Sequence, residues 1–341
     1  VVAFGMALAF VPETSDPQGR RIDFGGIFFG AAALACVSFA VIQGEDTGYS
    51  TWWIILLFVL SGVAALVFMA IQRVHSSPLV PPSLFTNAPM LGANFAAFVA
   101  YFGVFSIFFF TALYMQVVAG ASAYQTAVDF LPMAGGLVIA SALSGPWVAR
   151  AGPRVPMVVG CLLGAAGVLI TSSFLSPTVG FSTLGWALPI AGIGFGIAVV
   201  PITSTPLSVV PPERSGMAAS ATNTSRELGA VFGVAILGAI VNARLTGDLA
   251  SKLKSIGIPP SFQSLVLHAV TTGTLGSGAA AKARSSTNPA IAKIATKVIH
   301  AAYGAFGSGL HISLEVSGAL LCAGALVALF CVRRVTKTYE L

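Results

Sequence analysis

Long apolar runs, each about the length of a membrane span, recur along this 341-residue chain. A helix needs about 20 apolar residues to cross a hydrocarbon core of about 30 Å. The sequence predicts eight full spans by this count, the seventh only if 217–227 begins its helix: 24–43, 52–71, 91–118, 125–148, 155–175, 184–210, 217–241 and 307–332. Residues 1–11, apolar from the start, are interpreted as the end of one further span.

The scarcity of charge excludes a soluble protein. Only 8% of the residues are charged and 56% are hydrophobic, whereas a soluble domain carries roughly 25% charged residues. The period-2 alternation of membrane barrel strands is missing, and helices satisfy their own backbone hydrogen bonds in lipid. The predicted fold class is therefore an all-α integral membrane protein, and a soluble enzyme, a disordered chain and a disulfide scaffold are excluded.

The distribution of Lys and Arg predicts the orientation. Ten of the 17 lie on alternate connections and in the tail, and none lies in the opposite connections 44–51, 119–124 and 176–183. The positive-inside rule places the basic side, with the C-terminus, in the cytoplasm. The net charge of +6 is thereby explained by topology, so no nucleic-acid partner is predicted.

The other seven basic residues lie in 242–302, which the parity of the spans makes a long outer loop. Long loops largely escape the charge rule. Residues 274–287 are rich in Ser, Gly and Ala and are interpreted as flexible. Asn288 and Pro289 then have the pattern of a helix start. The helix after them is interpreted either as amphipathic and lying on the outer membrane surface or as an ordinary solvated helix.

A glycine- and arginine-rich turn between the apolar runs 125–148 and 155–175 carries a family resemblance. Gly145, Arg150, Gly152 and Arg154 match the short cytoplasmic signature of the major facilitator superfamily, in which glycines allow a tight turn. The acidic position of that signature is Ala149 here. The Asp–Arg contact that helps hold one conformation in the family therefore lacks its acid in this chain.

Three further stretches resemble the 14-span drug:proton antiporter branch (EmrB/QacA-like). They are the link Pro12-Glu13 with 21–26, the link Arg73 to Phe85, and the helix entry Gly216-Met217-Ala218 with 225–235. The resemblance implies that 1–11 ends span six, that 12–90 holds two inserted linker spans, and that 91–341 is the C-terminal six-helix bundle. It also implies that an N-terminal six-helix bundle of the same polypeptide is missing.

The resemblance further implies a secondary transporter that exports amphipathic or cationic drugs and toxic compounds in exchange for protons, by alternating access across the plasma membrane. A dedicated exporter of an endogenous metabolite or lipid is the alternative, and a non-transporting receptor is less favoured. No cofactor, metal or enzymatic activity is predicted, since the four His and four Cys show no ligand or catalytic spacing.

Polar groups at membrane depth supply the candidate pathway residues, because such groups are costly in lipid and mark pathways by default. His311 and Glu315 are four residues apart and share a helix face, and Glu315 is expected roughly 12 Å from the outer end of its span. The candidates for the substrate or proton pathway are Asp129, Glu315, His311, Asn94, Tyr101, Tyr114 and Gln116. The candidates for gating are Gly145, Arg150, Gly152, Arg154, Arg226 and Glu227. The alternatives are an interfacial acid hydrated from outside for Asp129, a pair that merely neutralises itself for His311 and Glu315, and an inner membrane anchor for Arg226 and Glu227.

Overall fold

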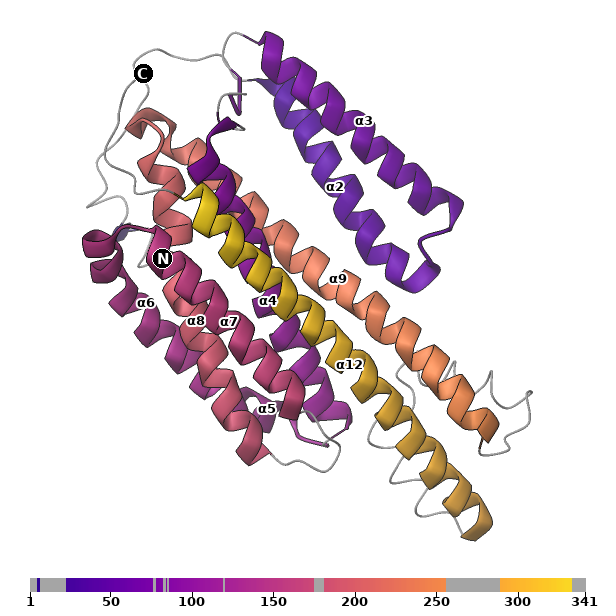
Figure 1. The fold of residues 1–341 in the computed structure, drawn as a ribbon. Helices are drawn as coiled ribbons and strands as arrows, with labels where there is room; N and C mark the ends of the chain where they lie inside the picture. The colour runs from indigo at the N-terminus through magenta and orange to yellow at the C-terminus, as the bar shows by residue number, and fades with distance from the viewer. Residues whose placement is uncertain are drawn as a thin grey trace.

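The computed structural model describes residues 5–6, 23–75, 78–81, 84, 86–118, 120–174, 181–255 and 289–332. Within these ranges every regular element is helical (Figure 1). Eight helices are long and apolar enough to cross a membrane, so the predicted all-α membrane fold with eight spans is confirmed. The expected end of a further span at 1–11 lies outside the described residues, apart from Gly5 and Met6. "Inner" and "outer" denote the sides that the basic residues predict.

Helices α2 (Phe24–Thr47) and α3 (Trp52–Val74) form an antiparallel pair beside the other helices (Figure 1). Ser61 donates a hydrogen bond to the Ala33 carbonyl across the pair, at 2.8 Å. The pair meets the bundle through α2 and α9, where Gly238 leaves room for the Glu45 carboxylate. Large side chains such as Leu66 are exposed, as is typical of helices that face lipid.

A polar network anchors the inner ends of this pair. Asp23 caps α2 by accepting from the Gly26 N–H at 2.7 Å, and its other oxygen accepts from the Gln72 side chain at 2.7 Å. The side-chain oxygen of Gln72, Oε1, accepts in turn from the Val80 N–H at 2.9 Å. The start of α2, the end of α3 and the following connection are therefore joined through a buried carboxylate and a buried amide.

The remaining helices form one bundle in which α4 packs against α9, α12 and α8, while α8 packs between α6 and α7. Its core is built mainly from apolar side chains of these helices, among them Phe102 and Phe110 of α4. The elements are α4 (Ala88–Val117), α5 (Ala123–Asp129), α6 (Leu131–Ala151), α7 (Arg154–Phe174), α8 (Phe181–Ser208), a 3-10 turn (Pro212–Arg214), α9 (Ser215–Ser255) and α12 (Pro289–Cys331).

Glycines let α8 approach both neighbours closely. A side chain at Gly194 would collide with the backbone of Gly164 in α7, whereas side chains at Gly192 and Gly196 would collide with carbonyls of α6. In α9, Gly229 meets the Phe98 carbonyl of α4 in the same way. Small residues at such contacts are the usual means of helix association in lipid.

The predicted span 125–148 is broken in two. The short helix α5 begins with a capping box of Ser122 and Gln125 and ends at Asp129, and α6 follows after Phe130. The break coincides with Pro132 in the first turn of α6, where the missing N–H of proline is tolerated.

The long outer loop expected at 242–302 is helical at both ends. Residues 242–255 continue α9, and 289–302 belong to α12, so the helix predicted after Asn288 is part of the last span and not a separate surface helix. The middle of the loop, 274–287, which the composition predicts to be flexible, lies outside the described residues. The two extensions project beyond the ends of α7 and α8 (Figure 1).

The extensions pack against each other through an apolar seam that periodic spacing explains. Leu245, Leu249 and Leu253 recur every fourth residue on α9 and meet Val298 and Ala302 of α12. The two helical extensions, 242–255 and 289–302, are together called the outer hairpin. Residues four apart lie on one helix face, so a polar-looking segment hides a continuous buried stripe.

Candidate functional site

One face of α4 is only partly covered by neighbouring helices: Asn94 and Tyr101 are half-buried, and Gln116 is exposed. Since successive residues are about 100° apart on a helix, Asn94, Tyr101 and Gln116 fall within about 60° of one another. Phe105 and Phe109 share this face and are 44% and 48% exposed. This set of five residues is called the open face of α4. Three of the predicted pathway residues therefore line one stripe, amid exposed aromatic side chains.

Tyr114 does not belong to that stripe. It points to the opposite side of α4, is 3% exposed and packs in the hydrophobic core. The ring of Tyr114 therefore supports the packing of α4 and is not part of the open face. Its pathway role stays a prediction.

Asn94 is held by α9. The Thr222 hydroxyl lies 3.0 Å from the Asn94 Oδ1 and also 3.0 Å from the Ala218 carbonyl of its own helix. Thr222 is buried, so Asn94 is joined to α9 at the edge of the open face. Sequence reasoning missed Thr222, which carries no charge and is common in membrane helices.

Arg226 lies among α4, α8 and α9. Its Nη2 donates to the Thr203 hydroxyl of α8, and its Cζ lies 5.2 Å from the centre of the Tyr101 ring. A cation over an aromatic face is attracted by the ring quadrupole. Arg226 is half-buried, while its sequence neighbour Glu227 is exposed. The predicted gating residue Arg226 and the predicted pathway residue Tyr101 thus meet, and Thr203 joins them.

The glycine- and arginine-rich signature is mostly helical. Gly145 and Arg150 lie in α6, Gly152 ends that helix with φ +79°, and Arg154 begins α7. A positive φ is strained for residues with a side chain, which accounts for the glycine at 152. Arg150 is exposed and Arg154 is half-buried, so the turn itself is shorter than the signature.

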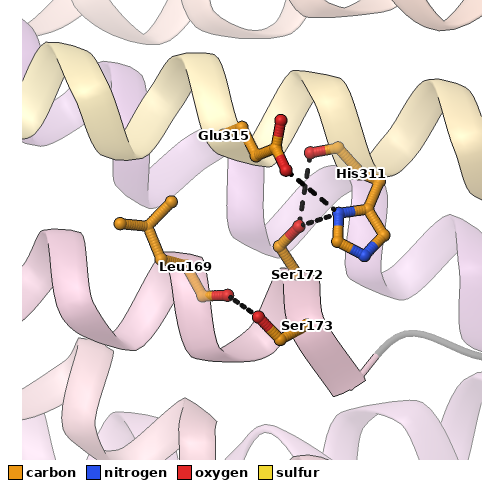
Figure 2. Close-up of polar contacts among 5 residues, drawn as sticks. All are labelled: Leu169, Ser172, Ser173, His311 and Glu315. Carbon is orange, nitrogen blue, oxygen red and sulfur yellow. Dashed lines mark hydrogen bonds and ion pairs between the residues drawn. The ribbon is translucent and has the colours of Figure 1, made fainter.

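A second polar cluster joins the outer end of α7 to the middle of α12 (Figure 2). The Ser172 hydroxyl lies 2.7 Å from His311 Nδ1 and 3.3 Å from the His311 carbonyl. Nδ1 also lies 3.5 Å from a Glu315 oxygen. If Nδ1 carries no proton, Ser172 donates to it; if it is protonated, it faces the carboxylate and the hydroxyl can donate to the carbonyl.

Glu315 lies about one helical turn from His311 along α12. Ser172 is two residues from Phe174, the last residue of α7, so His311 lies beside the outer end of that helix. Glu315 is four residues further along α12, about 6 Å along the axis. The depth of Glu315 in the membrane stays a prediction.

Asp129 ends α5 at the break before α6 and is half-buried. It lies on a different element from His311 and Glu315. The candidates therefore divide into three places: the open face of α4 with Arg226, the cluster of α7 and α12, and the end of α5.

Within the described residues, no group of three or more His, Cys, Asp and Glu side chains is placed to hold a metal ion.

Comparison with known proteins finds one matching family, a solved structure of similar fold and several curated relatives. Residues 72–234 match the Major Facilitator Superfamily. A solved bacterial homologue of the human lysosomal transporter Spinster, inward-facing and occupied, superposes with a TM-score of 0.53 at 15% identity. That superposition covers 91% of this chain and 67% of the other. At this identity the match shows the fold alone.

Curated relatives include a Multidrug resistance protein Stp of Mycobacterium tuberculosis, 28% identical over 77% of this chain and 48% of the relative. The Tetracenomycin C resistance and export protein of Streptomyces glaucescens is 25% identical over 91% of the chain and 56% of the relative. The Cephamycin export protein CmcT of Amycolatopsis lactamdurans is 30% identical over 75% and 53%. The chain thus spans about half the length of these relatives.

Proposed function

With residues 72–234 assigned to the major facilitator superfamily and the described helices sharing that fold, we propose that this chain is the C-terminal portion of an exporter of amphipathic compounds. In this proposal it belongs to the 14-span drug:proton antiporter branch, with α2 and α3 as the inserted pair and α4 to α12 as the second bundle. It lies in the plasma membrane with the C-terminus in the cytoplasm and the outer hairpin outside.

The open face of α4 is the observation that carries the proposal. A membrane helix that presents Asn94, Tyr101 and Gln116 beside exposed Phe105 and Phe109 combines hydrogen-bonding groups with aromatic surface, as permissive ligand sites do. Facilitator transport proceeds by rocking of two bundles around a site between them. We therefore assign this face to the wall of the transport path, opposite an N-terminal bundle of the same polypeptide.

Proton exchange would use the ionisable groups of the outer half. Asp129 at the end of α5, and His311 with Glu315 beside Ser172, are the carriers that the described part of this bundle offers. The Nδ1 of His311 lies within reach of both the Ser172 hydroxyl and a Glu315 oxygen, so this nitrogen can interact with either neighbour.

The proposal is tested in proteoliposomes that contain either the complete polypeptide bearing this segment or the 341-residue chain alone. The complete protein should move a fluorescent amphipathic drug against its gradient when a pH gradient is imposed, and the chain alone should not. If the complete protein shows no saturable transport, the proposed export function is wrong. If the chain alone transports the drug, a second bundle is not needed.

Proton coupling has its own controls. Asp129→Asn and Glu315→Gln should each reduce the dependence of transport on the pH gradient. If both variants keep the pH dependence of the unmodified protein, these two acids are not part of the coupling.

A dedicated exporter of one metabolite or lipid is the second candidate. The relatives are named both for multidrug resistance and for a single compound, tetracenomycin C or cephamycin. Competition by structurally unrelated drugs for one transported compound distinguishes the two candidates, because a dedicated exporter should show little of it.

A further inference from the structure

Arg226 is a membrane-embedded cation whose side chain contacts no carboxylate in the described residues. Its guanidinium meets the Thr203 hydroxyl and the Tyr101 ring, and its Nε is buried with no acceptor in the described residues. The contact between His311 and Glu315, at 3.5 Å, lies within α12 and does not involve Arg226. The positive charge is thus positioned by a neutral hydroxyl and an aromatic face.

The position of Arg226 argues against a surface anchor. It is eleven residues into α9, about 16 Å along the helix axis from Ser215. Tyr101 is thirteen residues into α4, about 20 Å from Ala88. A bilayer core is about 30 Å thick, so the pair reaches well into the bundle, where transporter sites lie.

An unpaired cation at this depth is costly, and such residues mark functional sites by default. The guanidinium presents a planar set of donors that suits carboxylate and phosphate geometry. Charge-assisted hydrogen bonds to such anions are about twice as strong as neutral ones. An anion beside Arg226 would supply the charge that the neighbouring side chains lack.

The surroundings define the rest of the ligand. Tyr101 stacks on Phe105 with ring centroids 6.3 Å apart, and Phe105 continues into the open face of α4. We propose that Arg226, positioned by Thr203 and Tyr101, binds the anionic group of an amphipathic substrate whose apolar body lies along Phe105 and Phe109. This assignment rests on the proposed export function, and it favours carboxylate-bearing compounds over the cationic ones.

Binding to the purified chain in nanodiscs of neutral phosphatidylcholine tests the assignment without any need for transport. The probes are dansyl-undecanoate, its neutral primary amide and the matching dansyl amine, each corrected with empty nanodiscs. The chain should bind the carboxylate at least tenfold more tightly than the amide or the amine. Equal affinity for all three probes, or tighter binding of the amine, would overturn the proposal.

Variants then locate the charge. Arg226→Gln should weaken carboxylate binding by about 10- to 100-fold, as loss of a hydrogen bond to a charged group does, and leave the amide unchanged. Arg226→Lys keeps the positive charge and should retain part of the preference for the carboxylate over the amide. Such retained binding would show that a substitution at this position does not by itself unfold the protein. Thr203→Val should weaken binding less. The matched control Arg214→Gln removes a basic residue of the inner turn and should change nothing; if it weakens binding as much as Arg226→Gln, the effect is general electrostatics.

The complete polypeptide separates the two sources of an anion. If dansyl-undecanoate binding to the complete protein also depends on Arg226, the anion comes from the substrate, as proposed. If the complete protein shows no such binding while the chain alone does, a carboxylate of the other bundle occupies Arg226 and the substrate assignment is wrong. Export can fail in the complete protein without altering the binding result, so the two proposals fail separately.

Discussion

Individual polar side chains in this protein act where helices end or meet. Asp23 caps one helix and holds the last turn of the next, and Ser172 meets a histidine on a neighbouring helix. Each is buried, with 4% and 1% of its surface exposed. Buried polar groups are costly unless they are hydrogen-bonded, so removing one partner should be measurable.

Asp23 should make the protein less stable in acid. Burial alone would raise the pKa of Asp23, but hydrogen bonds from the Gly26 N–H and the Gln72 amide, with the charge of His75, hold this pKa below its ordinary value. A depressed pKa stabilises the fold fully above about pH 4, the usual aspartate range. That contribution is lost as the pH falls through the folded-state pKa.

The variant Asp23→Asn should therefore be less stable at neutral pH, by about 1.5–3 kcal/mol, the usual contribution of a hydrogen bond to a charged group. Its stability should also fall less than that of the unmodified chain between pH 6 and pH 3. Thermal unfolding followed by circular dichroism at several pH values measures both effects. Parallel pH profiles for the two proteins would show that Asp23 does not titrate as described.

Ser172 and Ser173 offer a matched pair. Ser172 reaches His311 on α12, whereas Ser173 donates to the Leu169 carbonyl of its own helix at 3.0 Å (Figure 2). Ser172→Ala should lower the free energy of unfolding by about 1 kcal/mol, and Ser173→Ala should have almost no effect. In a His311→Ala background the effect of Ser172→Ala should shrink, and an unchanged effect would rule out the coupling.

At the scale of elements, helix contacts depend on small residues at particular turns. Gly192 and Gly196 face α6 and Gly194 faces α7, so successive even positions of α8 serve different neighbours. Glycines in membrane helices are typical of close helix contacts, but only the structure shows which neighbour each glycine contacts.

Gly194→Ala should separate α7 from α8. The added methyl would collide with the backbone of Gly164, which cannot move aside as a flexible side chain can. Overpacking of this kind costs about 1–3 kcal/mol, measurable by denaturation of the micelle-bound protein. The control Gly135→Ala lies on α6 with open space around it and should be neutral or slightly stabilising, since alanine favours helix. Equal losses in both variants would contradict the contact.

At the scale of the whole molecule, three parts can be distinguished: the α2–α3 pair, the bundle, and the outer hairpin (Figure 1). The hairpin has its own apolar seam, formed by Leu249 and Leu253, both fully buried, against α12. Asp248 accepts from Ser308 at 2.7 Å at the edge of this seam. The hairpin therefore has the core of a soluble helix pair while the bundle has the surface of a membrane protein.

Leu249→Ala should loosen the hairpin and leave the bundle intact. Loss of a buried leucine costs about 2–5 kcal/mol, and among the described residues the seam that loses it joins α9 to α12 outside the bundle. Hydrogen exchange should rise in residues 245–255 and 298–305 and stay unchanged in α4 and α8. The control Leu326→Ala, at a side chain that is 57% exposed, should change neither region. Exchange that rises throughout the bundle would show that the hairpin is not a separate unit.

The sequence alone determined the number of spans and the helical class, because hydrophobic length is a local property that lipid enforces on each helix separately. It also selected Asn94, Tyr101 and Arg226, since polar residues are rare at membrane depth. Only the tertiary structure decided that Tyr114 packs in the core while Tyr101 is half-buried beside Arg226, that Arg226 contacts Thr203, and that 242–255 pairs with α12. These outcomes depend on which face of each helix a neighbour covers, and that is set by the packing of residues far apart in the chain.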